Sequence, residues 1–91
     1  MVHNRRSEIE IIGHILRLSS EGAKKTELLY QGNFSYSQLQ GYLTFLLEKN
    51  ILEETEIKNN GSSTKCYKTT EKGFIFLQDV KKVLAHLDLK I

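Results

Sequence analysis

Apolar residues recur at helical spacing in several segments of this chain. Over residues 6–19, isoleucine and leucine return every three or four positions, from Ile9 to Leu16. A short apolar segment at 24–30 and a longer one at 35–50 follow, separated by SSEG and QGN. A last segment extends from residue 70, where Thr70 can cap a helix, to residue 89. The pattern predicts four helices joined by short turns.

Between the third and fourth helices, the chain changes to strand character. Residues 51–58 and 64–69 flank the stretch NNGSS, in which Asn and Gly can adopt the positive φ angles of a tight reversal. We therefore expect a β-hairpin with a polar tip. The predicted tip residues are Asn59, Asn60, Gly61, Ser62 and Ser63.

The order of these elements predicts the fold class. Three helices, a hairpin and a further helix in one compact unit are the arrangement of a winged helix-turn-helix, although other small α+β domains share the order. The expected fold is α+β and mainly α, with three helices, a two-stranded hairpin as the wing, and a C-terminal dimerisation helix.

The third helix has the best defined start. Ser35 and Gln38 form the S-x-x-Q pattern of a capping box, in which the Ser35 hydroxyl accepts from the backbone N–H of residue 38. Phe34 before the cap and Leu39 at the fourth helical position have the spacing of a hydrophobic staple. Two independent signals thus place the start of this helix at residue 35.

The same helix has an apolar face and an opposite face that is polar but nearly uncharged. A solvated face is usually rich in Glu and Lys, so this composition favours a contact surface over simple solvation, which is the alternative. The DNA major groove admits an α-helix, and Gln, Ser and Thr can bond to base edges there. The residues expected to face bases are Tyr36, Ser37, Gln40, Gly41 and Thr44.

Composition indicates one small domain but does not identify what the domain binds. The chain has 91 residues, of which 40% are hydrophobic and 26% charged, and its net charge is +2. Such a charge permits nucleic-acid binding without requiring it, so the positions of the basic residues matter more than their number. A domain of this size is only marginally stable alone, which favours a partner subunit.

Basic residues lie where a winged helix presents side chains to phosphates. An arginine pair opens the first helix, a lysine pair opens the second, and further lysines lie on the hairpin. Ordinary solvation is the alternative for any single pair. Because Glu53, Glu54 and Glu56 make the first strand acidic, we expect that strand to face away from DNA. The predicted phosphate contacts are Arg5, Arg6, Lys24, Lys25, Lys65 and Lys68.

Three blocks of the chain resemble a known family: RRSEIEIIGHIL, GAKKTELLYQGNFSYSQLQGYLTFLLEKNIL and YKTTEKGFIFL. They are similar to the small archaeal winged-helix DNA-binding proteins that dimerise through a C-terminal helix, a group of chromatin-type proteins and transcriptional regulators. The resemblance implies a recognition helix at 35–50, a wing tip at 59–63 and an antiparallel dimer. Where relatives commonly carry lysines, this chain has Gln40 and Gly41, which favours either base reading or weak DNA binding.

The apolar residues of the last helix alternate by three and four, as in a coiled coil, but over only about two heptads. Packing of this helix on its own domain is the alternative. We favour a dimer because three helices and the hairpin are expected to fill the core already, which would leave the stripe exposed. The domain division is 1–70 for DNA binding and 71–91 for dimerisation. The predicted interface residues are Phe74, Leu77, Val80, Leu84, Leu87 and Ile91.

Residue patterns for catalysis or metal binding are missing from the sequence. His3, His14 and His86 are scattered, and no phosphate loop or nucleophile motif occurs. The single Cys66 excludes an internal disulfide and suggests a reducing compartment. No segment has the pattern of a membrane helix or signal peptide. We expect a non-enzymatic, cytoplasmic protein without a cofactor, metal, small-molecule ligand or membrane partner.

The leading hypothesis is a homodimer that binds double-stranded DNA, as a transcriptional regulator or a chromatin-type protein. Helix 35–50 would enter the major groove, and the wing at 59–63 would lie on the adjacent backbone or minor groove. The alternative is a winged helix that serves as a protein–protein interaction module in a transcription or chromatin assembly. A third hypothesis is a regulator that responds to a ligand, or to oxidation of Cys66.

Overall fold

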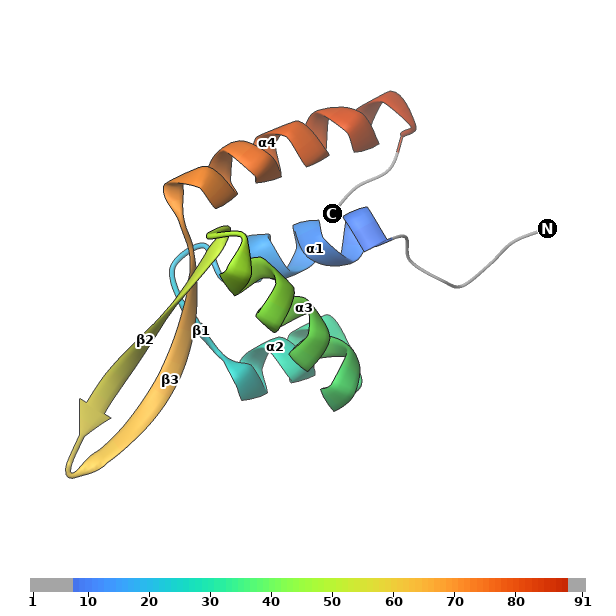
Figure 1. Cartoon of the computed structure of the whole chain (residues 1–91). Helices are drawn as coiled ribbons and strands as arrows, with labels where there is room; N and C mark the ends of the chain where they lie inside the picture. Colours follow the sequence, from blue (N-terminus) through green and yellow to red (C-terminus); the bar gives the residue numbers. More distant parts are fainter. Residues whose placement is uncertain (1–7, 89–91) are drawn as a thin grey trace.

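The computed structural model describes residues 8–88 and shows a group of helices from which a two-stranded hairpin projects (Figure 1). The predicted winged-helix fold, with its order of helices and hairpin, is confirmed. The elements are α1 (Glu8–Leu18), β1 (Ala23–Lys24), α2 (Lys25–Gly32), α3 (Tyr36–Glu48), β2 (Leu52–Asn59), β3 (Ser62–Thr69) and α4 (Glu71–His86).

Strand β1 is absent from the sequence prediction. It pairs with β3 in the antiparallel direction, with Ala23 opposite Tyr67 and Lys24 opposite Cys66, so that the sheet order is β1-β3-β2. Two residues are too few to show the alternation by which a strand is recognised. The pairing places the start of α2 next to the wing.

The wing is longer and its tip tighter than predicted. Strands β2 and β3 remain paired up to Asn59 opposite Ser62. Only Asn60 and Gly61 form the turn, with φ angles of 51° and 83°. Two successive positive φ angles give the two-residue turn whose twist matches that of the strands, and Asn-Gly is its preferred sequence. Asn59, Ser62 and Ser63 therefore belong to the strands and not to the loop.

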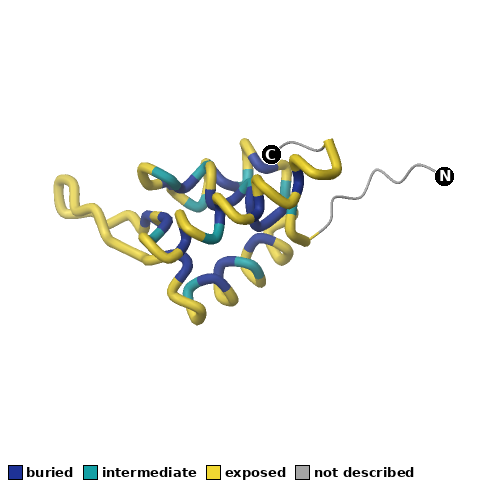
Figure 2. Tube along the Cα trace, turned by 90° about the horizontal axis from the view of Figure 1, so that it is seen from above, coloured by how far each residue is buried: buried dark blue, intermediate teal, exposed yellow. Residues whose placement is uncertain are grey.

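The core lies between the three N-terminal helices and the base of the hairpin, while most of the wing is exposed (Figure 2). The predicted apolar face of α3 points into this core, with Tyr42 and Leu47 partly buried at its edge. Burial of one leucine contributes about 1.5–3 kcal/mol, so these contacts determine which face of α3 remains outside. The buried leucines and isoleucines that meet here include Ile15, Leu16, Leu28, Leu39, Leu43 and Leu46.

Side-chain caps begin both α3 and α4. The Ser35 hydroxyl accepts from the backbone N–H of Gln38 at 3.2 Å, and the Thr70 hydroxyl accepts from that of Gly73 at 3.0 Å. Each cap typically contributes about 1 kcal/mol. Thr70 also donates to the carbonyl oxygen of Ile51 at 3.0 Å, which joins the start of α4 to the segment that follows α3.

Helix α4 packs along α1 of the same chain (Figure 1), and this changes the interpretation of its apolar stripe. Leu77, Val80 and Leu84 are only 6%, 4% and 3% exposed. Contrary to the expectation that the core is already filled, α1 has apolar residues on more than one side, and α4 covers those that the other helices leave open. These three side chains are therefore internal to the chain and are not a partner-facing stripe.

The remaining predicted interface residues have different positions. Phe74 and Leu87 are exposed, as the prediction requires, and Ile75 and Val83 are exposed on the same helix. Ile91 lies outside the described residues. These exposed residues do not form one patch, because at about 100° per residue Phe74 lies on the side of α4 opposite Val83. Val83 and Leu87, one turn apart, are the exposed apolar pair nearest the C-terminal end of α4, and pairing through them stays a prediction.

Candidate nucleic-acid interface

Helix α3 directs the predicted contact residues away from the core. The burial of Leu39, Leu43 and Leu46 leaves the opposite side of the helix in solvent, as the helical spacing predicts. The exposed residues are Tyr36, Ser37, Gln40, Gly41 and Thr44.

Lys25, the first residue of α2, reaches across to this exposed face. Its Nζ donates to the Tyr36 hydroxyl oxygen at 3.1 Å and to Oε1 of Gln40, and it lies 4.3 Å from the centre of the Tyr36 ring. Nε2 of Gln40 donates in turn to Oγ1 of Thr44 at 3.3 Å. We call Lys25, Tyr36, Gln40 and Thr44 the Lys25 cluster. The sequence predicts Lys25 as a phosphate contact, but the structure places it among the residues predicted to face bases.

Two local features position Lys25. The preceding residue, Lys24, is held in the sheet by its pairing with Cys66. The backbone N–H of Lys24 also donates to the Glu27 carboxylate at 2.9 Å, which stabilises the first turn of α2. A lysine side chain held in one conformation loses up to about 2 kcal/mol of rotamer entropy. Its hydrogen bonds and its position over the Tyr36 ring offset this cost.

A groove of about 420 Å³ separates the wing from α3. Lys24, Lys25 and Gln40 line it from the helical side, and Glu54 and Lys65 line it from the wing. The expectation that the acidic strand faces away is therefore wrong for Glu54, whose carboxylate lies 3.5 Å from Nζ of Lys65. Neighbouring side chains of a strand point to opposite faces, so the three glutamates of β2 cannot all face one way.

The two predicted phosphate contacts on the wing, Lys65 and Lys68, lie on opposite faces of it. Lys65 shares one face with Tyr67, whereas Lys68 shares the other with Cys66, because side chains alternate along β3. The structure therefore brings Lys24, Lys25 and Lys65 to one groove and places Lys68 elsewhere. The two predicted arginines, Arg5 and Arg6, lie outside the described residues.

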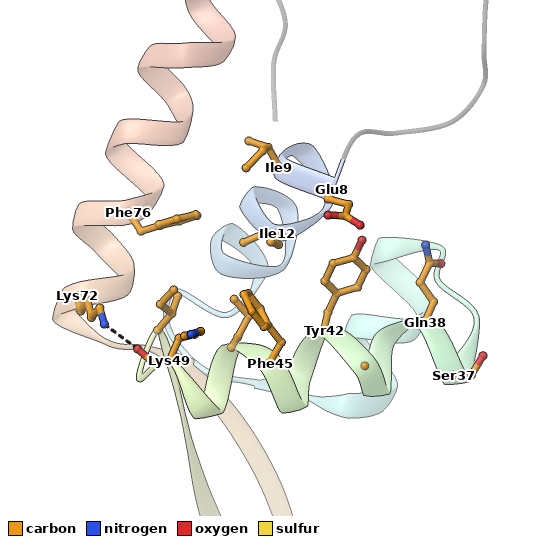
Figure 3. A pocket seen from close by; sticks show the side chains of 13 residues that line it. Glu8, Ile9, Ile12, Ser37, Gln38, Tyr42, Phe45, Lys49, Lys72 and Phe76 are labelled. Atoms are coloured by element: carbon orange, nitrogen blue, oxygen red, sulfur yellow. Dashed lines mark hydrogen bonds between the residues drawn. The ribbon is translucent and has the colours of Figure 1, made fainter.

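A larger groove, of about 780 Å³, lies along the other flank of α3, between α1 and the start of α4 (Figure 3). We call it the Phe45 groove. Much of its lining is aromatic or aliphatic, and both Ile9 and Phe45 are more than two-fifths exposed, at 42% and 45%. At one end, Nζ of Lys72 donates to the backbone oxygen of Lys49 at 2.9 Å. Phe45, an aromatic residue outside the leucine face, is the sequence signal that could have indicated this surface.

Two predicted base-facing residues also touch the Phe45 groove. Ser37 and Gly41 line its edge, so they lie between the polar flank of α3 and the apolar one. A Cβ atom added to Gly41 would meet nothing within 4 Å, which leaves the backbone open to close approach by a ligand.

Tyr42 faces Glu8 at the end of the Phe45 groove (Figure 3). Burial, together with the negative charge of Glu8, raises the pKa of the Tyr42 phenol above its ordinary value of 10.0. The phenol therefore remains protonated at neutral pH and is able to donate a hydrogen bond.

Cys66 and His14, whose side chains are capable of redox or metal chemistry, pack within the fold. Cys66 is buried, and the His14 ring lies edge-on to Phe34 with centroids 6.3 Å apart. Among residues 8–88, no group of three or more His, Cys, Asp or Glu side chains could hold a metal ion. Within the same described part of the chain, no helix combines the length and apolarity needed to cross a membrane.

Comparison with solved structures connects this geometry to known proteins. Sso10a-2, a DNA-binding protein from Sulfolobus solfataricus, has a TM-score of 0.77 at 26% sequence identity, over 91% of this chain and 83% of that one. A PadR-like transcription factor from Bacteroides fragilis has a TM-score of 0.73 at 23% identity, over 87% and 84%. A PadR family transcriptional regulator from Eggerthella lenta has a TM-score of 0.70 at 22% identity, over 85% and 70%.

The two PadR structures establish similarity of fold, while Sso10a-2 is somewhat closer in sequence. A comparison with curated proteins gives no match. The winged helix-turn-helix family, by contrast, matches residues 5–87, which include the helical core, the wing and α4. This chain belongs to the winged helix-turn-helix family.

Proposed function

We propose that this protein binds double-stranded DNA as a homodimer and acts as a transcriptional regulator or a chromatin-type protein. The observation that carries the proposal is the Lys25 cluster, in which a basic side chain is joined to polar side chains on the exposed face of α3. The description of Sso10a-2 as a DNA-binding protein and of two further similar structures as PadR-type regulators supports the same function.

In this proposal α3 enters the major groove, whose width admits a helix. The wing lies against the adjacent backbone or minor groove. Lys24 and Lys65, which line the groove between the wing and α3, contact phosphates. Glu54 lies beside Lys65 and reduces the attraction, so binding is weaker than the number of lysines alone suggests.

The homodimer forms through α4. Val83 and Leu87, exposed one turn apart at its C-terminal end, pair with the same residues of a second copy, in an antiparallel arrangement. Exposed aliphatic side chains that lie side by side favour association because pairing removes their surface from water. Sedimentation of the intact chain and of a Val83→Asp, Leu87→Asp variant tests this contact, and an unchanged molecular mass would contradict it.

A pair of lysines on opposite faces of β3 gives a matched test of DNA binding. We expect Lys65→Gln to lower affinity and to reduce the slope of log Kd against log salt by about 0.9, the effect of one lost phosphate contact. Lys68→Gln removes the same charge from the other face of the wing and leaves the slope nearly unchanged. Electrophoretic shifts with random and genomic duplexes across a salt series measure both. Absence of binding at low salt would refute the proposed function.

The Phe45 groove supports a second candidate function, that of a protein-interaction module. Its volume of about 780 Å³ and the exposure of Ile9 and Phe45 are suited to an apolar segment of a partner protein. We expect Phe45→Gln to abolish capture of such a partner from a nuclease-treated extract while DNA binding remains. A protein retained equally by the variant would contradict this use of the groove.

A further inference from the structure

The Lys25 cluster determines how Gln40 can bond to a base. A free glutamine side chain presents both a donor and an acceptor, and the pair matches adenine, which offers the N7 acceptor and the N6 donor in the major groove. Here Oε1 of Gln40 already accepts from the ammonium of Lys25, and Nε2 already donates to Thr44. The acceptor side of Gln40 therefore faces a positive charge.

Every member of the Lys25 cluster retains a hydrogen-bond donor, and the remaining lone pair of Gln40 Oε1 lies beside the Lys25 ammonium. An ammonium group has three N–H donors, and Lys25 uses two of them on Tyr36 and Gln40. The Gln40 amide has a second N–H, and the Thr44 hydroxyl accepts from Gln40 and keeps its own hydrogen. The exposed face of α3 thus presents donors beside a positive charge.

The burial of Lys25 agrees with a role at α3. Its neighbour Lys24 is exposed, whereas Lys25 is partly buried and bonded to two side chains of another helix. A lysine that serves phosphates alone would be expected to extend into solvent like Lys24. Lys25 instead lies over the Tyr36 ring, where its charge is held beside Tyr36 and Gln40 of the predicted contact surface.

We propose that the Lys25 cluster selects guanine over adenine at one position of the bound DNA. Guanine offers two acceptors, N7 and O6, to the donors of the cluster. Adenine replaces O6 with an N6 donor, which then meets the Lys25 ammonium where it needs an acceptor. Lys25 is thereby a specificity-determining residue. This inference rests on the proposed binding of α3 in the major groove.

The test begins with selection of bound duplexes from a random pool by the full-length protein, followed by Kd measurements on the selected site. At one guanine of that site, exchange of the G·C pair for A·T should weaken binding about 5- to 100-fold. Lys25→Met keeps an unbranched side chain as far as Cε, removes the ammonium and frees Oε1 of Gln40. We expect this variant to lose the guanine preference or to prefer adenine at the same position.

Two controls separate base reading from general attraction. Lys24→Met removes the same charge from the neighbouring residue and should weaken binding to both duplexes alike. Replacement of the selected guanine by 7-deazaguanine deletes the N7 acceptor and should weaken the wild-type protein but have little effect on Lys25→Met. Circular dichroism of each variant establishes that it is folded.

The outcomes distinguish this inference from the proposed function. Salt-sensitive binding without a guanine preference, or a preference that persists in Lys25→Met, would overturn the inference and leave DNA binding intact. Failure of the wild-type protein to bind any duplex at low salt would overturn both.

Discussion

The two flanks of α3 are built from different interactions. On the flank toward the wing, Lys25, Gln40 and Thr44 are joined by directional hydrogen bonds. On the flank toward α1, the Phe45 groove exposes Ile9 and Phe45, whose contacts are apolar and non-directional. The first flank is suited to a ligand with defined donors and acceptors, and the second to an apolar surface. One helix therefore presents two surfaces of different chemistry.

The largest loss of stability is expected from a change in the core beneath α3, because both flanks belong to this helix. Leu43 is 1% exposed and lies in the core beneath α3. We expect Leu43→Ala to lower the free energy of unfolding by about 2–5 kcal/mol, through lost burial and the cavity that remains. Urea denaturation measures this loss. The control Thr44→Ala changes an exposed neighbour and should alter stability by less than about 0.5 kcal/mol. A small effect of Leu43→Ala would mean that the flanks do not depend on this core.

Gly41, at the boundary between the flanks, allows stability and binding to be separated. We expect Gly41→Ala to raise the free energy of unfolding by about 0.5–1 kcal/mol, because alanine is the better helix former and its Cβ meets nothing. DNA affinity should fall if close approach of the backbone is what Gly41 provides. Urea denaturation and electrophoretic shifts measure the two effects, and a rise in both would refute the role in close approach.

Gly73 is the matched control for this substitution. A Cβ added there would collide with the carbonyl oxygen of Ile51, which is backbone and cannot move aside freely. Gly73→Ala should therefore lower the free energy of unfolding by about 1–3 kcal/mol, opposite in sign to Gly41→Ala.

The smallest effect is expected at Tyr42, beside the apolar flank. Its pKa is raised in the folded chain, so the folded state holds the phenol proton more tightly than the unfolded state. This contribution to stability is fully present below about pH 10 and is lost as the pH rises through the folded-state pKa. Tyr42→Phe should reduce the loss of stability as the pH rises above about 10, measured by urea denaturation. Parallel losses in both proteins would contradict the assigned cause.

Local signals in the sequence predicted much of the fold. The cap of α3 at Ser35 depends on residues within one helical turn, and so does the cap of α4 at Thr70. The Asn60–Gly61 turn likewise depends on two neighbouring residues. The spacing of the leucines separated the buried from the exposed side of α3 for the same reason.

The candidate site was predicted in part. The exposed polar residues of α3 followed from helical spacing, but the bond from Lys25 to Gln40 joins residues 15 positions apart and has no local pattern. The direction of Glu54 depended on the register of β2 against β3, in which a shift of one residue reverses every side chain. Neither feature can be read from periodicity alone.

The amino-acid sequence by itself determined the four helices and the two strands of the wing, the caps of α3 and α4 and the apolar face of α3, because these properties arise from neighbours within about four residues. Only the tertiary structure decided that β1 pairs with the wing, that α4 buries Leu77, Val80 and Leu84 on α1, and that Lys25 joins Gln40 on the face of α3. These contacts depend on how distant elements pack, and packing is selected by the burial of the whole core rather than by any single segment.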